Sequence, residues 1–129
     1  MNKPCVVIFF TLCFLFVLEK ILFLRNEKQV YMYLDHYNSK LSTVCRQYHV
    51  KTLYAFGSVL TSRFNNGSDL DLIVAFNDIP VEDYADNYFD FKFSLQDIFN
   101  RQIDLIEEQA IKNPYFRRKI DNTKQIIYG

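Results

Sequence analysis

Residues 57–74 read GSVLTSRFNNGSDLDLIV, and this stretch decides how the chain folds. It opens on a Gly-Ser pair, passes through the turn-forming residues 65–68 (NNGS) and runs into the apolar segment 70–76 (LDLIVAF). A short β-prone segment, 51–56 (KTLYAF), comes directly before it. The stretch is therefore predicted to join a short first strand to a second strand that is mostly buried.

The flanking sequence alternates between helix-like and strand-like segments. Apolar spacing of three and four predicts helices, and short β-branched or aromatic runs predict strands. The order predicts an α/β (α+β) domain, a small mixed sheet flanked by helices. The predicted segments are helices at 34–48, 59–64, 81–100 and 115–121, and strands at 51–56, 70–76, 102–106 and 124–128.

Three acidic residues interrupt the apolar strands. Asp69 and Asp71 bracket Leu70, and Asp104 lies in the segment 102–106 (QIDLI). Residues two apart on a strand face the same side, so Asp69 and Asp71 point together. Adjacent carboxylates repel each other unless a cation lies between them, and oxygen-only ligands select a hard ion such as Mg²⁺. If the strand of Asp104 is a neighbour, three carboxylates converge into a site for two ions.

A Gly-Ser pair between a strand and a helix is typical of a phosphate-binding turn. Gly57 would let a phosphate approach the backbone, and N–H groups at the start of a helix bind anions. Each signal is weak alone, since Gly-Ser marks ordinary turns and an Asp-x-Asp pair can cap a turn or face solvent. The turn, the paired carboxylates and the third carboxylate together form a more specific set.

The same stretch resembles the signature of the minimal nucleotidyltransferases of the DNA polymerase β superfamily. That signature is Gly-Ser, ten residues, then Asp-x-Asp, and here the intervening residues are 59–68. The similarity extends from about residue 34 to the C-terminus and includes 101–108 (RQIDLIEE). The resemblance implies a polymerase-β-like nucleotidyltransferase fold.

The resemblance implies that Gly57 and Ser58 hold the phosphates of a nucleoside triphosphate. Many members of the family carry Arg-Gly in the third and fourth positions after Gly-Ser, where this chain has Thr61-Ser62. Arg63 lies close by and is the candidate to supply the missing positive charge.

The implied reaction is transfer of a nucleoside monophosphate, AMP from ATP in the first instance, to a hydroxyl group. Asp69 and Asp71 would bind Mg²⁺, and Asp104 would help to bind metal and activate the acceptor hydroxyl. Minimal members often act as antitoxins that modify a tyrosine of a HEPN ribonuclease toxin, so a HEPN-type protein is the implied partner. The alternative is a non-catalytic binding module that neutralises a partner protein.

Composition excludes few classes of protein. Lys plus Arg and Asp plus Glu both total 15, and this balance gives no general argument for nucleic-acid binding, so direct DNA binding is not expected. The three cysteines have no zinc-site or CxxC spacing, which predicts reduced thiols and fits the cytoplasm.

The N-terminal segment differs from the rest of the chain. Residues 5–18 form an uncharged apolar run, shorter than the roughly 20 residues that a spanning helix needs. Glu19-Lys20 interrupts the run before it resumes at 21–24, and charges inside a bilayer are costly.

Three interpretations of this segment stay open. Translation starts at Met32 or the segment is an accessory one, residues 5–24 are a membrane anchor, or the segment is a signal peptide. The predicted division is an apolar segment at 1–31 and a nucleotidyltransferase domain at 32–129. The expected location is the cytoplasm, with membrane contact only if 5–24 is a real anchor.

Overall fold

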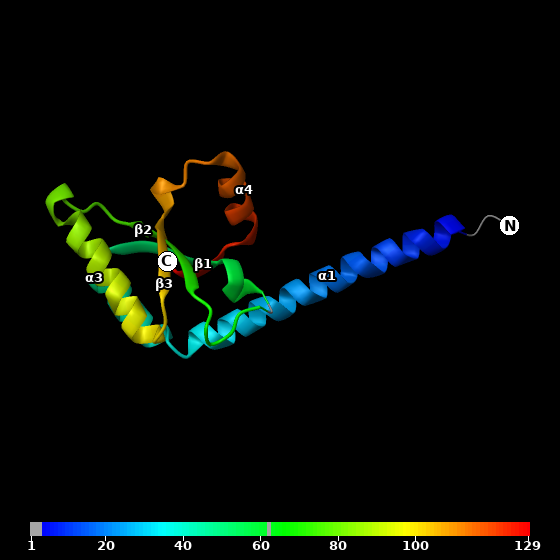
Figure 1. The fold of residues 1–129 in the computed structure, drawn as a ribbon, viewed down its shortest axis with the longest axis horizontal. Helices are drawn as coiled ribbons and strands as arrows, with labels where there is room; N and C mark the ends of the chain where they lie inside the picture. Colours follow the sequence, from blue (N-terminus) through cyan, green and yellow to red (C-terminus); the bar gives the residue numbers. More distant parts are fainter. Residues whose placement is uncertain (1–3, 62) are drawn as a thin grey trace.

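The computed structural model describes the backbone of residues 4–61 and 63–129, and the side chains of residues 13–21, 28, 30–61 and 63–129. Helix α1 extends away from the sheet, and α3 lies beside β3 (Figure 1). The elements in chain order are α1 (Pro4–Asp35), α2 (Asn38–Gln47), β1 (Val50–Phe56), the 3₁₀ turn η1 (Gly57–Leu60), β2 (Leu70–Phe76), α3 (Val81–Phe99), β3 (Ile103–Glu107), the 3₁₀ turn η2 (Glu108–Ala110), α4 (Pro114–Thr123) and β4 (Gln125–Tyr128).

The four strands form one mixed sheet in the order β3-β2-β1-β4. Strand β1 pairs antiparallel with β2 and β4, while β2 pairs parallel with β3. Helix α3 joins the parallel pair, because two parallel strands need a long crossover connection. This arrangement confirms the predicted mixed α/β domain.

The core lies between one face of the sheet and helices α2 and α3. Alternate side chains of each strand point into the core. Apolar side chains four residues apart on α2 and α3 cover it from the other side. Fully burying one such side chain stabilises the fold by about 1.5–3 kcal/mol. The buried residues include Leu53 and Ala55 of β1, Leu70, Leu72 and Val74 of β2, Leu41 and Cys45 of α2, and Phe91, Leu95 and Phe99 of α3.

One predicted helix is divided in the structure. The helix expected at 34–48 is broken by a turn at residues 36–37, where α1 ends and α2 begins. The ring of Tyr37 packs at this turn against the rings of Tyr33 and Phe99, with centroids 5.6 Å and 5.0 Å away. The apolar spacing continues across the turn, so periodicity did not reveal the break.

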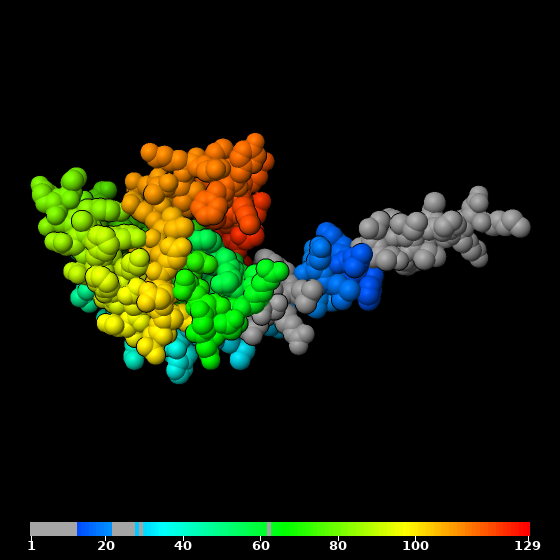
Figure 2. Space-filling view, in the orientation of Figure 1, coloured from blue at the N-terminus to red at the C-terminus, as the bar shows by residue number. Residues whose placement is uncertain are grey.

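Helix α1 changes character along its length. The side chains of residues 13–21 are exposed, to 64% at Phe14, and they stand clear of the folded body (Figure 2). Val30 and Leu34 are instead buried in the core. No helix in the described part of the chain is both long and apolar enough to cross a membrane. The boundary expected at residue 32 falls within α1, and that division stays a prediction.

Helix α3 also closes part of the free edge of β3. The Leu70 N–H donates to the Gln102 carbonyl at 3.0 Å, so that carbonyl points toward β2. Carbonyl directions alternate along a strand, and the Leu105 carbonyl therefore points away from β2. It accepts a hydrogen bond from the Tyr88 hydroxyl. This edge carbonyl thus has a partner within the protein.

Two truncated chains test which part of α1 belongs to the domain. Deleting residues 1–27 is expected to leave thermal unfolding near that of the full chain, because the removed side chains that the structure describes are exposed. Deleting residues 1–31 also removes Val30, which should lower the free energy of unfolding by about 1.5–3 kcal/mol. Circular dichroism melts measure both effects. Equal stability of the two truncated proteins would contradict the role given to Val30.

Candidate functional site

Parallel pairing of β2 with β3 makes Asp71 and Asp104 direct neighbours. The two residues are Cα partners in the register, which confirms the expected adjacency of their strands. By alternation both lie on the face opposite the buried Leu70 and Leu72. Asp69 precedes the first residue of β2, so it belongs to the loop and not to the strand as expected. Two of the three carboxylates are therefore placed by the sheet and one by a loop.

Burial and the neighbouring charges act on the carboxyl group of Asp71. Burial raises the pKa of Asp71 above its ordinary value, and the negative charges of Asp104 and Asp69 raise it further. A hydrogen bond from the backbone N–H of Ser58 acts in the opposite direction and lowers this pKa. Three acidic groups within electrostatic range of each other favour a cation at this point of the sheet.

The donor chemistry fits a hard divalent ion, since the three aspartates offer only oxygen. However, no three His, Cys, Asp or Glu side chains of the described residues are gathered as a ready-made metal site. Asp69 and Asp104 are exposed and Asp71 is half-buried. Binding one ion to all three would require the exposed side chains to rotate toward Asp71, and the metal assignment stays a prediction.

Gly57 lies where the end of β1 meets Asp71. Its φ of +73° is in the left-handed region, and a Cβ added there would collide with the Asp71 Oδ2 and lie 3.2 Å from its Cγ. Phe56, the preceding residue, is the register partner of Asp71. Glycine is required here by the backbone angle and by the closeness of the carboxylate, a reason that differs from the phosphate approach predicted from sequence.

Ser58 lies between two of the aspartates. Its backbone N–H interacts with Asp71, and its hydroxyl donates to the Asp69 carbonyl oxygen at 3.4 Å. The segment continues only as the 3₁₀ turn η1 and not as the helix expected over 59–64. Thr61 ends this turn, and its hydroxyl donates to the Ser58 carbonyl at 2.8 Å.

Arg63 belongs to the loop between η1 and β2. Its backbone N–H donates to the Thr61 hydroxyl at 3.3 Å, and its carbonyl accepts from the Asn65 side-chain amide at 3.3 Å. Its side chain is exposed, and its neighbour Ser62 lies outside the described residues. A role for Arg63 in nucleotide binding stays a prediction.

Arg101 is a residue of this region that sequence reasoning passed over. One of its terminal nitrogens, Nη1, donates to the carbonyls of Asn65 at 3.1 Å and Ser68 at 2.9 Å. One signal in the sequence could have revealed it. Arg101 is a basic residue directly before the predicted strand of Asp104, and this strand was expected to lie beside the strand that follows Asp69.

The segment around α4 covers the neighbouring part of the same sheet face. Tyr54 is two residues from Phe56 on β1, and the Lys124 ammonium lies 4.4 Å from its ring centroid. Glu108 pairs with both Arg117 and Lys124 at 3.3 Å. These two basic side chains are engaged within the protein, which leaves them less available to an external partner.

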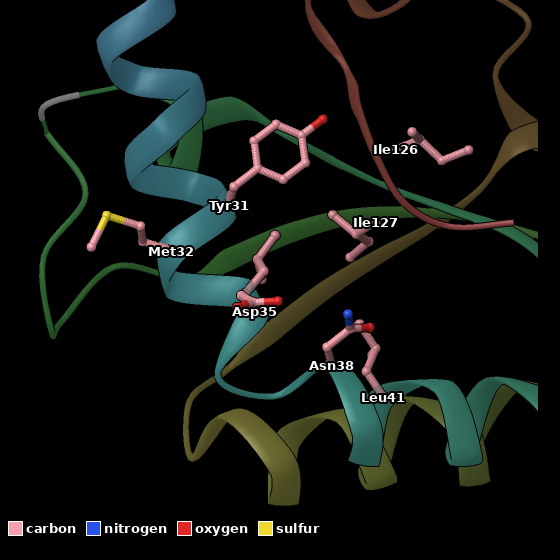
Figure 3. Close-up of a pocket in the computed structure, with 8 residues that line it drawn as sticks. Tyr31, Met32, Asp35, Asn38, Leu41, Ile126 and Ile127 are labelled. Atoms are coloured by element: carbon pink, nitrogen blue, oxygen red, sulfur yellow. The ribbon is translucent and has the colours of Figure 1, made fainter.

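A shallow pocket of about 280 Å³ is lined by residues other than Asp69, Asp71 and Asp104, and Figure 3 shows it. It is formed by the end of α1, the start of α2 and strand β4. Strand β4 is at the opposite edge of the sheet from β3, so two strands separate this pocket from Asp104. The pocket is therefore separate from the acidic residues Asp69, Asp71 and Asp104. Its lining residues are Tyr31, Met32, Leu34, Asp35, Asn38, Leu41, Ile126 and Ile127.

Comparison with known proteins gives a family match over most of this fold. The family model described as polymerase beta, nucleotidyltransferase, matches residues 39–129. A candidate protein adenylyltransferase of Methanocaldococcus jannaschii, MJ0128, is 34% identical over 82 residues, which cover 64% of this chain and 79% of that protein. A second from the same organism, MJ1379, is 29% identical with the same coverage.

Solved structures share the fold at low identity. A candidate minimal nucleotidyltransferase superposes with a TM-score of 0.57 at 22% identity, covering 71% of this chain and 93% of the other. A toxin–antitoxin complex with AMP-PNP superposes with a TM-score of 0.55 at 16% identity, covering 71% of this chain and 73% of the other. A complex of a tri-AMPylated Shewanella oneidensis HEPN toxin with an MNT antitoxin has a TM-score of 0.51 at 14% identity, covering 74% of this chain and 72% of the other.

Replacing Gly57 with Ala is expected to lower the free energy of unfolding by about 1–3 kcal/mol, because the positive φ and the Asp71 carboxylate both oppose a Cβ. Gly67→Ala is the matched control, since a Cβ there would meet only the Asn65 Oδ1 at 3.4 Å. The control should change stability by less than about 1 kcal/mol. Urea titrations of both variants measure this, and equal losses would contradict the close approach of Asp71.

The raised pKa of Asp71 predicts a pH dependence in the metal-free protein. The folded state keeps the proton in a range where the unfolded chain has lost it, so stability falls as pH rises from about 4 through the raised pKa. The Asp71→Asn variant should lack this pH dependence, and it should be at least as stable as wild type at about pH 7. Melting temperatures in EDTA measure it, with Asp78→Asn, a change in the exposed loop after β2, as the control. Parallel curves for wild type and Asp71→Asn would disprove the expectation.

Proposed function

This chain belongs to the polymerase β nucleotidyltransferase family, and we propose that it uses Mg²⁺ and ATP to transfer AMP to a hydroxyl group of a partner protein. The observation that carries the proposal is the pairing of Asp71 with Asp104, with Asp69 near enough to raise the pKa of Asp71. Nucleotidyl transfer needs such an acidic cluster, because its reacting oxygens are charged and have to be neutralised by metal ions.

The three aspartates divide into two kinds of metal ligand. Asp71 and Asp104 project from paired strands, whose geometry is fixed by backbone hydrogen bonds, and Asp69 enters from the loop. Mg²⁺, when bound, supplies charge neutralisation at the attacking and leaving oxygens. In the proposed site the aspartates hold two ions, and the exposed carboxylate of Asp69 rotates toward them when the nucleotide binds.

Gly57 and Ser58 are proposed to hold the triphosphate. Gly57 keeps the backbone at the end of β1 free of a side chain, and the half-exposed Ser58 carries a hydroxyl next to the Asp69 backbone. This hydroxyl can turn toward a phosphate oxygen, which is a stronger acceptor than a carbonyl because it is charged. The exposed side chain of Arg63 adds a positive charge on the same loop.

Asp104 is proposed to take the proton of the acceptor. Its side chain is exposed on β3, beside Asp71, so an acceptor hydroxyl from another molecule can reach it. The hydroxyl oxygen attacks the α-phosphorus of ATP as its proton passes to the Asp104 carboxylate. The bond from that phosphorus to the bridging oxygen of the leaving group breaks, and pyrophosphate departs.

The proposed acceptor is a tyrosine of a HEPN-type toxin, in the cytoplasm where ATP is available. Two relatives carry names of candidate protein adenylyltransferases, and two structures of similar fold are toxin–antitoxin complexes, one with an AMPylated HEPN toxin. Because Asp104 is exposed at the edge strand of the sheet, a side chain presented by a docked protein fits this site.

Transfer of radiolabelled AMP from ATP to the product of a neighbouring HEPN-type gene tests the proposal. Asp69→Asn and Asp71→Asn should abolish labelling, because each removes a metal ligand. Asp104→Asn should reduce labelling strongly while ATP binding falls less, because its main task concerns the acceptor. Ser58→Ala should weaken nucleotide binding by about 1–3 kcal/mol through a lost hydrogen bond to charged phosphate.

Asp78→Asn serves as the control in this assay and should label the partner like wild type. Unchanged labelling in the Asp69 and Asp71 variants would refute the metal ligands. If wild type labels nothing with any of several nucleoside triphosphates, the chain is instead a binding module that neutralises its partner without catalysis.

A further inference from the structure

We propose that Arg101 is a positioning residue, which clamps the loop ahead of β2 so that Asp69 enters the site in one orientation. Arg101 lies in the turn between α3 and β3 and touches none of the three aspartates in the described hydrogen bonds. Its effect on Asp69 is therefore indirect. The consequence for catalysis rests on the proposed function, whereas the clamp itself is a property of the loop.

The clamp acts on two backbone carbonyls of one tight turn. The Arg101 Nη1 donates to the Asn65 carbonyl at 3.1 Å and to the Ser68 carbonyl at 2.9 Å. Asn65 and Ser68 also close the turn themselves, since the Ser68 N–H donates to the Asn65 carbonyl at 3.1 Å. The Ser68 carbonyl belongs to the peptide unit that joins Asp69, and this unit is planar. Fixing that carbonyl fixes the direction in which the chain enters Asp69.

Two further contacts hold the backbone on the other side of Asp69. The carbonyl of Gln102, the residue after Arg101, accepts from the Leu70 N–H at 3.0 Å. The Ser58 hydroxyl donates to the carbonyl of Asp69 itself at 3.4 Å. The backbone of Asp69 is thus held on both sides while its carboxylate stays exposed. The carboxylate therefore stays accessible to a ligand, while the backbone that carries it is restrained.

Aromatic rings hold the guanidinium in place. Its carbon lies 4.4 Å from the ring centroid of Phe64, which belongs to the same loop, and 5.5 Å from that of Tyr33 in α1. The Nε is buried and has no hydrogen-bond partner among the described residues, so the group is fixed by Nη1 and by the rings. A planar guanidinium can stack on a ring and reach two carbonyls, and the compact ammonium of Lys cannot reproduce both.

Variants of Arg101 separate this clamp from general stability. Arg101→Gln removes the charge and the carbonyl contacts, Arg101→Lys keeps the charge alone, and Arg46→Gln on the exposed side of α2 is the matched control. The first readout is amide hydrogen exchange in metal-free protein. Exchange at Ser68 and Leu70 should be at least about tenfold faster in Arg101→Gln, which corresponds to about 1.4 kcal/mol, and unchanged at Leu72 in the sheet.

The second readout is Mn²⁺ binding, followed by electron paramagnetic resonance without ATP or acceptor. Affinity should fall by about five- to tenfold in Arg101→Gln and by less in Arg101→Lys, because a poorly placed Asp69 is a poorer ligand. Arg46→Gln should match wild type in both measurements. A purely structural role would raise exchange at Leu72 together with the loop and would overturn the proposal.

The proposal would also be overturned if the amides of Ser68 and Leu70 exchanged at the same rate in Arg101→Gln as in wild type. If Arg101→Gln does not fold, Arg101→Lys decides, and wild-type exchange and Mn²⁺ affinity in that variant would disprove the clamp. Neither readout needs nucleotide transfer. A wild-type protein that transfers nothing would therefore refute the proposed function while leaving the clamp as a separate result.

Discussion

Asp71 and Asp104 lie side by side because β2 and β3 run parallel in register, and burial together with the negative charge of Asp104 raises the pKa of Asp71. Holding like charges together is unfavourable, and the opposite face of the same strands offsets it. There Leu70, Leu72 and Leu105 are buried against the helices, so each strand contributes apolar burial on one face and acidic groups on the other. The sheet tolerates this repulsion because the register of its strands is set by the buried face and not by the acidic residues.

The third carboxylate is placed by different means. Asp69 lies outside the sheet, and its backbone is held by the hydroxyl of Ser58 and by contacts from the turn that contains Arg101. These contacts hold the backbone of Asp69, while its carboxylate is exposed and can rotate. The site therefore joins two acids placed by paired strands to a third whose backbone is held and whose side chain can reorient. This combination suits a reaction in which a charged nucleotide has to enter, react and leave.

Sequence alone predicted the strands of the site well, since buried leucines and acids alternate visibly in 70–76 and 102–106. It could not predict the turn at 36–37, because the apolar spacing runs across it. The role of Arg101 was also hidden. Its partners are backbone carbonyls 33 and 36 residues away in the chain, and carbonyl groups leave no mark on a pattern of side chains. Gly57 was predicted to let a phosphate approach the backbone, but the neighbour that requires glycine there, Asp71, becomes visible only in three dimensions.

The hydroxyl of Tyr88 on the Leu105 carbonyl has a consequence for how other proteins can approach. An exposed sheet edge invites a foreign segment to extend the sheet by one more strand, a mode of recognition that also leads to aggregation. On β3 a hydrogen-bonding position that such a segment would use is already occupied from within. A segment that extended the sheet at β3 would have to displace this hydroxyl. A protein that delivers a hydroxyl to Asp104 avoids that cost if it approaches across the face of the sheet, led by a side chain.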